Sequence, residues 1–126
     1  MPENLGAIAD SIRTSLDATN KAREEGLTAC RRVIRSASLS IRAIHRHETM
    51  EALRFRSEAS EALHEAQSAL SKFPQIAFSG PLLDAEKEYA ESVLTSTLVE
   101  GGDLPDPEAV GVRPTSWLHG LAEAAS

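Results

Sequence analysis

An apolar repeat between residues 27 and 44 constrains the fold of this chain more than any other feature of its sequence. Six apolar residues follow one another at alternating steps of three and four: Leu27, Cys30, Ile34, Ala37, Ile41 and Ile44. Steps of this size place side chains on one face of an α-helix, because the helix turns by about 100° per residue. We therefore expect a long amphipathic helix whose apolar face is covered by other helices.

The same stretch carries a strong positive charge within an acidic chain. Five arginines and no acidic residue lie between Leu27 and His47, although the formal net charge of the whole chain is −6. Four of these arginines fall within an arc of about 60° beside the apolar face. We call them the arginine row: Arg31, Arg35, Arg42 and Arg46. None has an Asp or Glu three or four residues away, so the row needs a partner from outside its own helix.

Two kinds of partner for the arginine row stay open. Either carboxylates of another helix, in the same or a second subunit, neutralise it, or phosphate groups do. His45 adjoins the row and is a further candidate donor to phosphate. Because the rest of the chain is acidic, any binding of nucleic acid has to be local to this row.

The remaining sequence also predicts helices, and no alternating strand pattern competes with them. We expect a single all-α domain over residues 1–126, folded as an antiparallel helical bundle. The expected helices cover residues 4–16, 17–47, 50–73 and 81–99, a single turn after Asp106-Pro107, and a last helix from about residue 114. Thr49 is the expected N-cap of the third helix, and five residues are expected on its inner side: Leu53, Ala59, Leu63, Ala66 and Leu70.

Composition limits the class of protein. The single cysteine, Cys30, lies on the apolar repeat and is expected to be a small core residue, so no disulfide forms within the chain. This fits a cytoplasmic protein. No stretch is apolar and long enough for a membrane span or a signal peptide, so we expect no membrane partner.

A second one-sided charge pattern lies in the fourth expected helix. Asp84, Glu88 and Glu91 are spaced at i, i+4 and i+7, which places the three carboxylates within about 60° of one another. Such carboxylates repel unless a cation lies between them, either an arginine or a hard divalent ion such as Mg²⁺ or Mn²⁺. Ordinary solvation of an exposed helix face explains the same pattern. His64 and His119 stand alone in the sequence, and surface roles are expected for both.

Two segments resemble the translin family in its prokaryotic, chiefly archaeal, form. They are RRVIRSASLSIRAIHR, over residues 31–46, and SGPLLDAEKEYAESVLTSTLVEGGDLPDPEAVGVRPTSWLHGLAEA, over residues 79–124. The EYAE segment, the proline-containing loop and the WLHGLAEA helix opening are specific as a set. The resemblance runs from about Asp17 to the C-terminus.

The resemblance implies an all-helical protein that assembles into homo-oligomeric rings or shells, commonly octamers, and binds single-stranded RNA or DNA. The eukaryotic partner of translin adds a Mg²⁺-dependent endoribonuclease. Glu88 and Glu91 correspond to the paired catalytic, metal-binding carboxylates of nuclease-active members. Glu123 stands where those members carry an aspartate, one methylene shorter. Family members continue beyond the last helix, so this chain is expected to form the N-terminal part of the family fold, incomplete at its C-terminus.

Three functions follow as hypotheses. The first is binding of single-stranded RNA or DNA through the arginine row and His45. The second is a Mg²⁺-dependent endoribonuclease that uses Glu88, Glu91 and Glu123. The third is a helical assembly module in which the arginine row pairs with the acidic face of the fourth helix.

Overall fold

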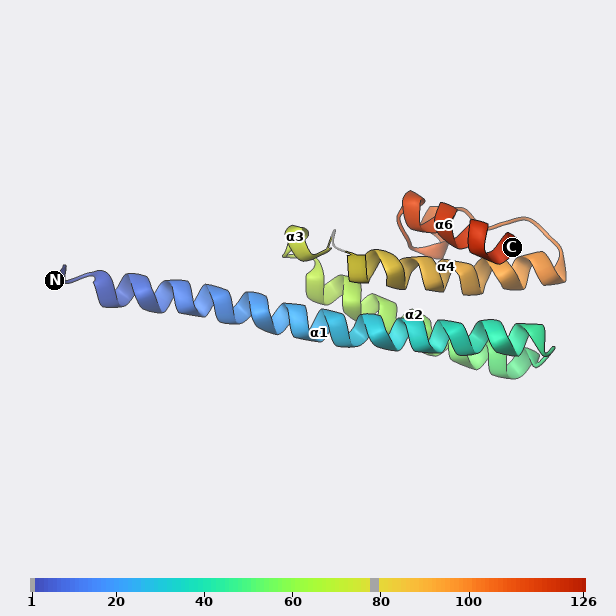
Figure 1. Ribbon diagram of the computed structural model, residues 1–126, viewed down its shortest axis with the longest axis horizontal. Helices are drawn as coiled ribbons and strands as arrows, with labels where there is room; N and C mark the ends of the chain where they lie inside the picture. Colours follow the sequence, from blue (N-terminus) through green and yellow to red (C-terminus); the bar gives the residue numbers. More distant parts are fainter. Residues whose placement is uncertain (1, 78–79) are drawn as a thin grey trace.

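The computed structural model describes residues 2–77 and 80–126, and the fold is all-α, as predicted (Figure 1). No strand occurs in these residues. The helices in the described residues are α1 (Leu5–His45), α2 (Thr49–Leu70), α3 (Pro74–Ala77), α4 (Gly80–Glu100), α5 (Pro107–Val110) and α6 (Pro114–Ala125).

Helix α1 is continuous, so the predicted break near residue 17 is wrong. Asp17 and Thr19 favour helix caps, but the Thr19 hydroxyl donates to the Ser15 carbonyl oxygen at 3.0 Å, within the helix. No proline interrupts the segment. Local ion pairs also support it, with Arg13 lying 3.1 Å from Asp10 and Lys21 lying 4.0 Å from Glu25.

A tight turn reverses the chain between α1 and α2. His47 adopts a left-handed conformation with φ of 59°, and the Glu48 amide donates to the Ala43 carbonyl oxygen at 2.9 Å. Helix α2 then runs back along α1. Thr49 is the first residue of α2 rather than its N-cap, and Glu48 holds the cap position without a side-chain hydrogen bond.

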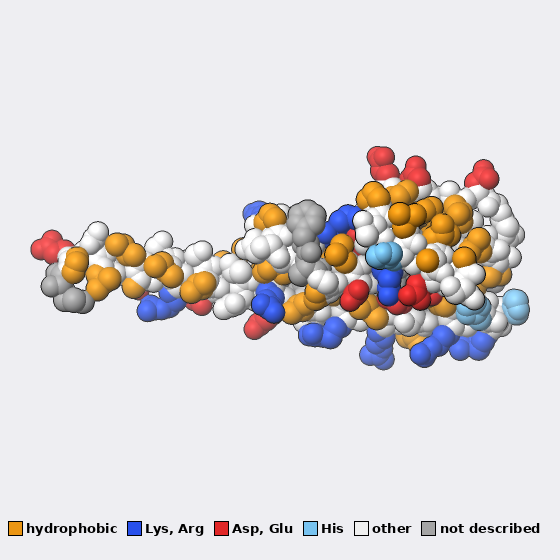
Figure 2. All heavy atoms as spheres, turned by 45° about the horizontal axis from the view of Figure 1, so that its top comes forward, with side chains coloured by type: hydrophobic (Ala, Val, Ile, Leu, Met, Phe, Trp, Pro, Cys, Tyr) orange, Lys and Arg blue, Asp and Glu red, His pale blue; other side chains and the backbone are white. Residues whose placement is uncertain are grey.

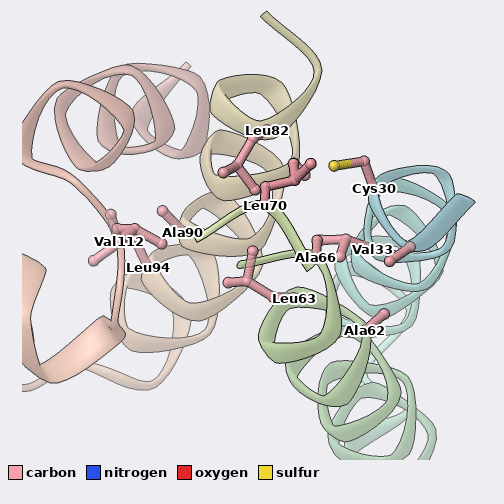
Figure 3. Packing of buried hydrophobic residues seen from close by; sticks show 12 residues of the cluster. Cys30, Val33, Ala62, Leu63, Ala66, Leu70, Leu82, Ala90, Leu94 and Val112 are labelled. Atoms are coloured by element: carbon pink, nitrogen blue, oxygen red, sulfur yellow. The ribbon is translucent and has the colours of Figure 1, made fainter. Parts of the chain in front are cut away.

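The core lies between α1, α2 and α4. Cys30 is buried as predicted, and its side chain points from α1 toward Leu70 of α2 and Leu82 of α4 (Figure 3). Gly26 leaves room for Leu70 where α2 packs on α1, because a Cβ added to Gly26 would lie 2.6 Å from the Leu70 side chain. The other predicted inner residues of α2 are buried: Ala59, Leu63, Ala66 and Leu70.

Leu53 departs from the predicted inner side of α2. It is exposed, because Ala52 faces α1 in its place and accepts a hydrogen bond from the Ser40 hydroxyl at 2.7 Å. Helix α6 covers the side of α4 that lies away from α2 (Figure 1). Among the described residues, no helix is both long and apolar enough to cross a membrane.

Candidate nucleic-acid interface and carboxylate cluster

The arginine row lies exposed along α1. In the described part of the chain, Arg31, Arg35 and Arg42 form no ion pair with a carboxylate, and Arg31 makes only a 3.5 Å hydrogen bond to the Thr28 hydroxyl. His45 is exposed at the end of the same helix. These guanidinium groups are therefore open to a ligand from outside the chain.

Arg46 differs from the other members of the row. Its Nε and Nη2 lie 3.2 Å and 3.3 Å from the two carboxylate oxygens of Glu48. For Arg46 the partner from outside its own helix is Glu48, because the chain leaves α1 after His45 and brings this carboxylate alongside. Arg32, which lies outside the row, is also neutralised, by Glu65 of α2 at 2.6 Å.

The row does not pair with the acidic face of α4. Over the residues that the structure describes, no ion pair joins it to Asp84, Glu88 or Glu91. Figure 2 shows Lys and Arg side chains along the lower edge of one face, and acidic side chains with a histidine nearer its middle. The internal pairing that the third hypothesis allows is therefore absent within the described chain.

A cluster of charged side chains forms where α6 packs on α4. We call it the carboxylate cluster: Glu88 and Glu91 of α4, Glu123 of α6, and the ammonium group of Lys87. Lys87 Nζ lies 3.9 Å from Glu88 Oε1 and 3.6 Å from Glu123 Oε1. The fold thus brings Glu123 beside Glu88 and Glu91, although Glu88 and Glu123 lie 35 positions apart in the sequence.

The cluster disfavours ionisation of two of its carboxyl groups. Partial burial raises the pKa of Glu88, and the charges of Glu123 and Asp84 raise it further, while Lys87 opposes them. Burial likewise raises the pKa of Glu91, with added repulsion from Glu88 and Glu123. At Glu88, burial is the largest cause and the charge of Lys87 the next, so the pKa is raised although a lysine lies beside the carboxylate.

Gly120 allows α6 to reach the cluster. A Cβ at this position would lie 2.8 Å from the Ala90 Cβ and 3.0 Å from both the Glu91 amide nitrogen and the Lys87 carbonyl oxygen. Helix α6 therefore crosses α4 almost at backbone contact, one helical turn before Glu123. Only glycine permits this approach without a backbone shift.

A buried carboxylate, which the sequence analysis missed, fixes the loop that leads into α6. Glu86 is 2% exposed and accepts hydrogen bonds from the Arg113 amide at 3.0 Å and from Gln67 Nε2 at 3.3 Å. Arg113 also donates from Nη2 to the Ala77 carbonyl oxygen at 2.8 Å. The burial of Glu86 could have been predicted from its sequence position, because Leu82 and Ala90 lie four residues away on either side, on the buried face of α4.

An open hollow of about 500 Å³ adjoins the cluster. Asp84, Lys87, His119 and Glu123 line it, together with Ala122 and Ser126. His119, expected to stand alone, is therefore a neighbour of the charged residues. Sequence spacing could not reveal this, because the contact depends on how α6 docks on α4.

Comparison with known proteins identifies the fold. No protein-family model and no curated protein sequence matches the chain. The solved structure of apo-NeC3PO, a translin-like helical protein, superimposes with a TM-score of 0.82 at 18% sequence identity. The chain has a translin-like fold. The match covers 98% of this chain and 65% of NeC3PO, so the chain spans a little under two thirds of the length of that protein.

The translin-like resemblance implies a metal at the carboxylate cluster. Three glutamates offer the hard oxygen donors that suit Mg²⁺ or Mn²⁺. As placed, however, the Lys87 ammonium lies among these carboxylates, and no three acidic, histidine or cysteine side chains in the described ranges are arranged to share an ion. The observed arrangement therefore does not fit a bound metal.

Proposed function

We propose that this translin-like protein binds single-stranded RNA or DNA through the arginine row on α1. The observation that carries the proposal is that Arg31, Arg35 and Arg42 are exposed on one helix face and form no ion pair in the described part of the chain. The outer two of these three span about 17 Å along the helix, at 1.5 Å per residue. Guanidinium groups in such a line suit successive phosphates of a flexible strand.

The chemistry of the row favours backbone contacts over base reading. Base stacking requires exposed aromatic rings. Trp117 is part-buried and donates to the Pro105 carbonyl oxygen at 3.0 Å, and Phe55 is part-buried beneath the Arg54 guanidinium. We therefore expect weak sequence selectivity and a strong dependence on salt.

A double variant tests the proposed interface. Arg35→Ala with Arg42→Ala removes two phosphate contacts, so we expect the affinity for labelled single-stranded oligonucleotides to fall at least tenfold at moderate salt, measured by fluorescence anisotropy. The matched control is Arg13→Ala with Lys21→Ala, which removes the same charge from exposed residues elsewhere on α1. Equal losses in both double variants would show that the row has no special role.

The family resemblance also suggests Mg²⁺-dependent cleavage of RNA at the carboxylate cluster, but the observed arrangement does not fit a bound metal, so this function would require Lys87 to leave the cluster. The observation that favours it is the convergence of Glu88, Glu91 and Glu123, the residues that the family resemblance assigns to the nuclease site. Any divalent ion would compete there with the Lys87 ammonium.

Cleavage of labelled single-stranded RNA, with Mg²⁺ and with a chelator, tests this second function. If the parent chain cleaves RNA with Mg²⁺, Glu88→Gln or Glu91→Gln should abolish that cleavage and leave binding intact, because both residues lie outside the arginine row. Glu108→Gln is a matched control on the exposed helix α5. Cleavage that survives in both glutamine variants would rule the cluster out as the site.

A further inference from the structure

The arginine row is unevenly spaced along α1. Arg31 and Arg35 are four residues apart, which is about 6 Å along the helix axis at 1.5 Å per residue. Arg35 and Arg42 are seven residues apart, or about 10.5 Å. A nucleic-acid strand carries one phosphate per nucleotide, so a strand that follows the row presents a phosphate between Arg35 and Arg42 that no guanidinium group of the row lies opposite.

Ser38 lies in this gap. It follows Arg35 by three residues and precedes Arg42 by four, which places the three side chains within an arc of about 60°. With Ser38 included, residues of α1 recur at steps of four and three along one continuous ridge of the helix. We call it the donor ridge, because each of its side chains can donate a hydrogen bond: Arg31, Arg35, Ser38, Arg42 and His45.

The hydroxyl of Ser38 is available to a ligand. The residue is half-buried, and its hydroxyl forms no hydrogen bond within the described residues. By contrast, the helical hydroxyls of Ser92 and Thr97 each donate to a carbonyl oxygen of their own helix, at 2.6 Å and 3.3 Å. The donor in the gap of the row is therefore not committed to the backbone.

We propose that Ser38 donates a hydrogen bond to a phosphate of the bound single strand, between the phosphates that Arg35 and Arg42 hold. Such a contact rests on the proposed function, because it belongs to the same interface. Serine hydroxyls bind backbone phosphates in many protein–nucleic acid complexes, and these contacts position the strand without reading its sequence. Since the serine side chain is short, the phosphate that it contacts lies close to the surface of α1, with a longer arginine side chain on either side.

A hydroxyl contact differs from an arginine contact in its dependence on salt. A guanidinium group that neutralises a phosphate of a single strand releases counterions, and each such contact contributes about 0.7 to the slope of the logarithm of the binding constant against the logarithm of salt concentration. A neutral hydroxyl contributes nothing to this slope. Loss of the Ser38 contact should therefore lower the affinity at an unchanged slope, whereas loss of an arginine changes both quantities.

Ser38→Ala tests the contact itself. We expect the affinity for labelled single-stranded oligonucleotides to fall about fivefold, with the slope of the parent chain, in fluorescence anisotropy titrations at several salt concentrations. Ser38→Thr keeps the hydroxyl and is expected to retain most of the affinity. Alanine favours a helix more than serine does, so a merely structural role of Ser38 predicts no such loss.

Ser11→Ala is the matched control for this substitution. Ser11 also lies on α1, is exposed and forms no hydrogen bond within the described residues, but it is far from the donor ridge along the helix. Its replacement is expected to leave both the affinity and the slope at the values of the parent chain. Circular dichroism confirms that each variant folds.

Ser38→Arg tests whether a phosphate lies over the gap. An arginine at this position would add a guanidinium contact, so the affinity should rise and the slope should become steeper by about 0.7. Ser11→Arg adds the same charge away from the ridge and is expected to keep the slope of the parent chain.

The results distinguish a failure at Ser38 from a failure of the whole interface. If the parent chain binds with a slope of about −2 while Ser38→Ala binds as tightly as the parent, or Ser38→Arg keeps the slope of the parent, the arginine row binds phosphate without Ser38 and the proposed contact is overturned. A parent chain without salt-dependent binding would overturn the proposed function and, with it, the contact at Ser38.

Discussion

The side chains of Glu88 and Glu91 are partly buried, and their neighbours are other carboxylates and one lysine. Burial raises the pKa of both groups, and repulsion within the carboxylate cluster adds to the effect. The folded state therefore binds protons at these residues more tightly than the unfolded chain does. At neutral pH the ionised carboxylates of the cluster lower the stability of the folded state. Destabilised charged groups of this kind are typical of functional sites.

The pH dependence of stability follows from the sign of these shifts. A carboxyl group whose pKa is raised in the folded state favours folding at pH values below the pKa that it has in the unfolded chain. For glutamate this unfolded pKa is 4.5. That contribution is lost as the pH rises through the raised folded value. We therefore expect Glu88→Gln and Glu91→Gln to raise the melting temperature at pH 7 relative to the parent chain, and to have little effect at pH 4.

Thermal unfolding of the parent and both variants at these two pH values checks the prediction. Glu108→Gln on exposed α5, where no comparable cluster forms, is the control for loss of a single charge. A lower melting temperature of both glutamine variants at pH 7 would mean that the Lys87 contacts outweigh burial and repulsion.

The carboxylate cluster forms only when α6 is docked on α4, because Glu123 belongs to α6. Gly120 permits near backbone contact with α4, and the hydrogen bonds of Glu86 to Arg113 and Gln67 hold the preceding loop. Both features favour the position of α6 in which Glu123 lies near Glu88 and Glu91.

Gly120→Ala is expected to separate α6 from α4. The added Cβ would meet backbone atoms at 3.0 Å, which cannot move as a flexible side chain can. Overpacking of this kind costs about 1–3 kcal/mol and exceeds the gain in helix propensity of up to about 1 kcal/mol. We expect a net loss of about 1 kcal/mol in urea unfolding and a changed Trp117 fluorescence.

Gly6→Ala is the matched control, because a Cβ at Gly6 meets nothing within 4 Å. It is expected to keep or slightly raise the stability. If Gly120→Ala were as stable as Gly6→Ala, the close approach of α6 to α4 would not constrain the site.

The elements differ in how well their sequence predicts them. The bounds of α4, α5 and α6 follow from Pro81, Gly101, Pro107 and Pro114, since proline and glycine act locally. The break predicted near Asp17 was wrong, because a residue that favours a cap is tolerated in a helix when its side chain bonds within it. The neighbourhood of Lys87, His119 and Glu123 depends on helix docking, and no local pattern encodes it.

In the whole molecule, the arginine row and the carboxylate cluster lie apart, on different helices. The arginine row runs along α1, the carboxylate cluster lies between α4 and α6, and the described residues show no ion pair between the two. An acidic protein that leaves three arginines unpaired on one helix face has a local surface suited to phosphate. The chain shares its translin-like fold with NeC3PO over 98% of its length.

The salt dependence of single-strand binding is the sharpest test of phosphate binding by the arginine row. With three phosphate contacts, the logarithm of the binding constant should fall against the logarithm of salt concentration with a slope near −2, at about 0.7 per contact. The Arg35→Ala, Arg42→Ala double variant should reduce the slope by about 1.4, and the Arg13→Ala, Lys21→Ala control should leave it unchanged. A parent chain that shows no salt-dependent binding, or a double variant with the parent's slope, would contradict the claim that the arginine row binds phosphate.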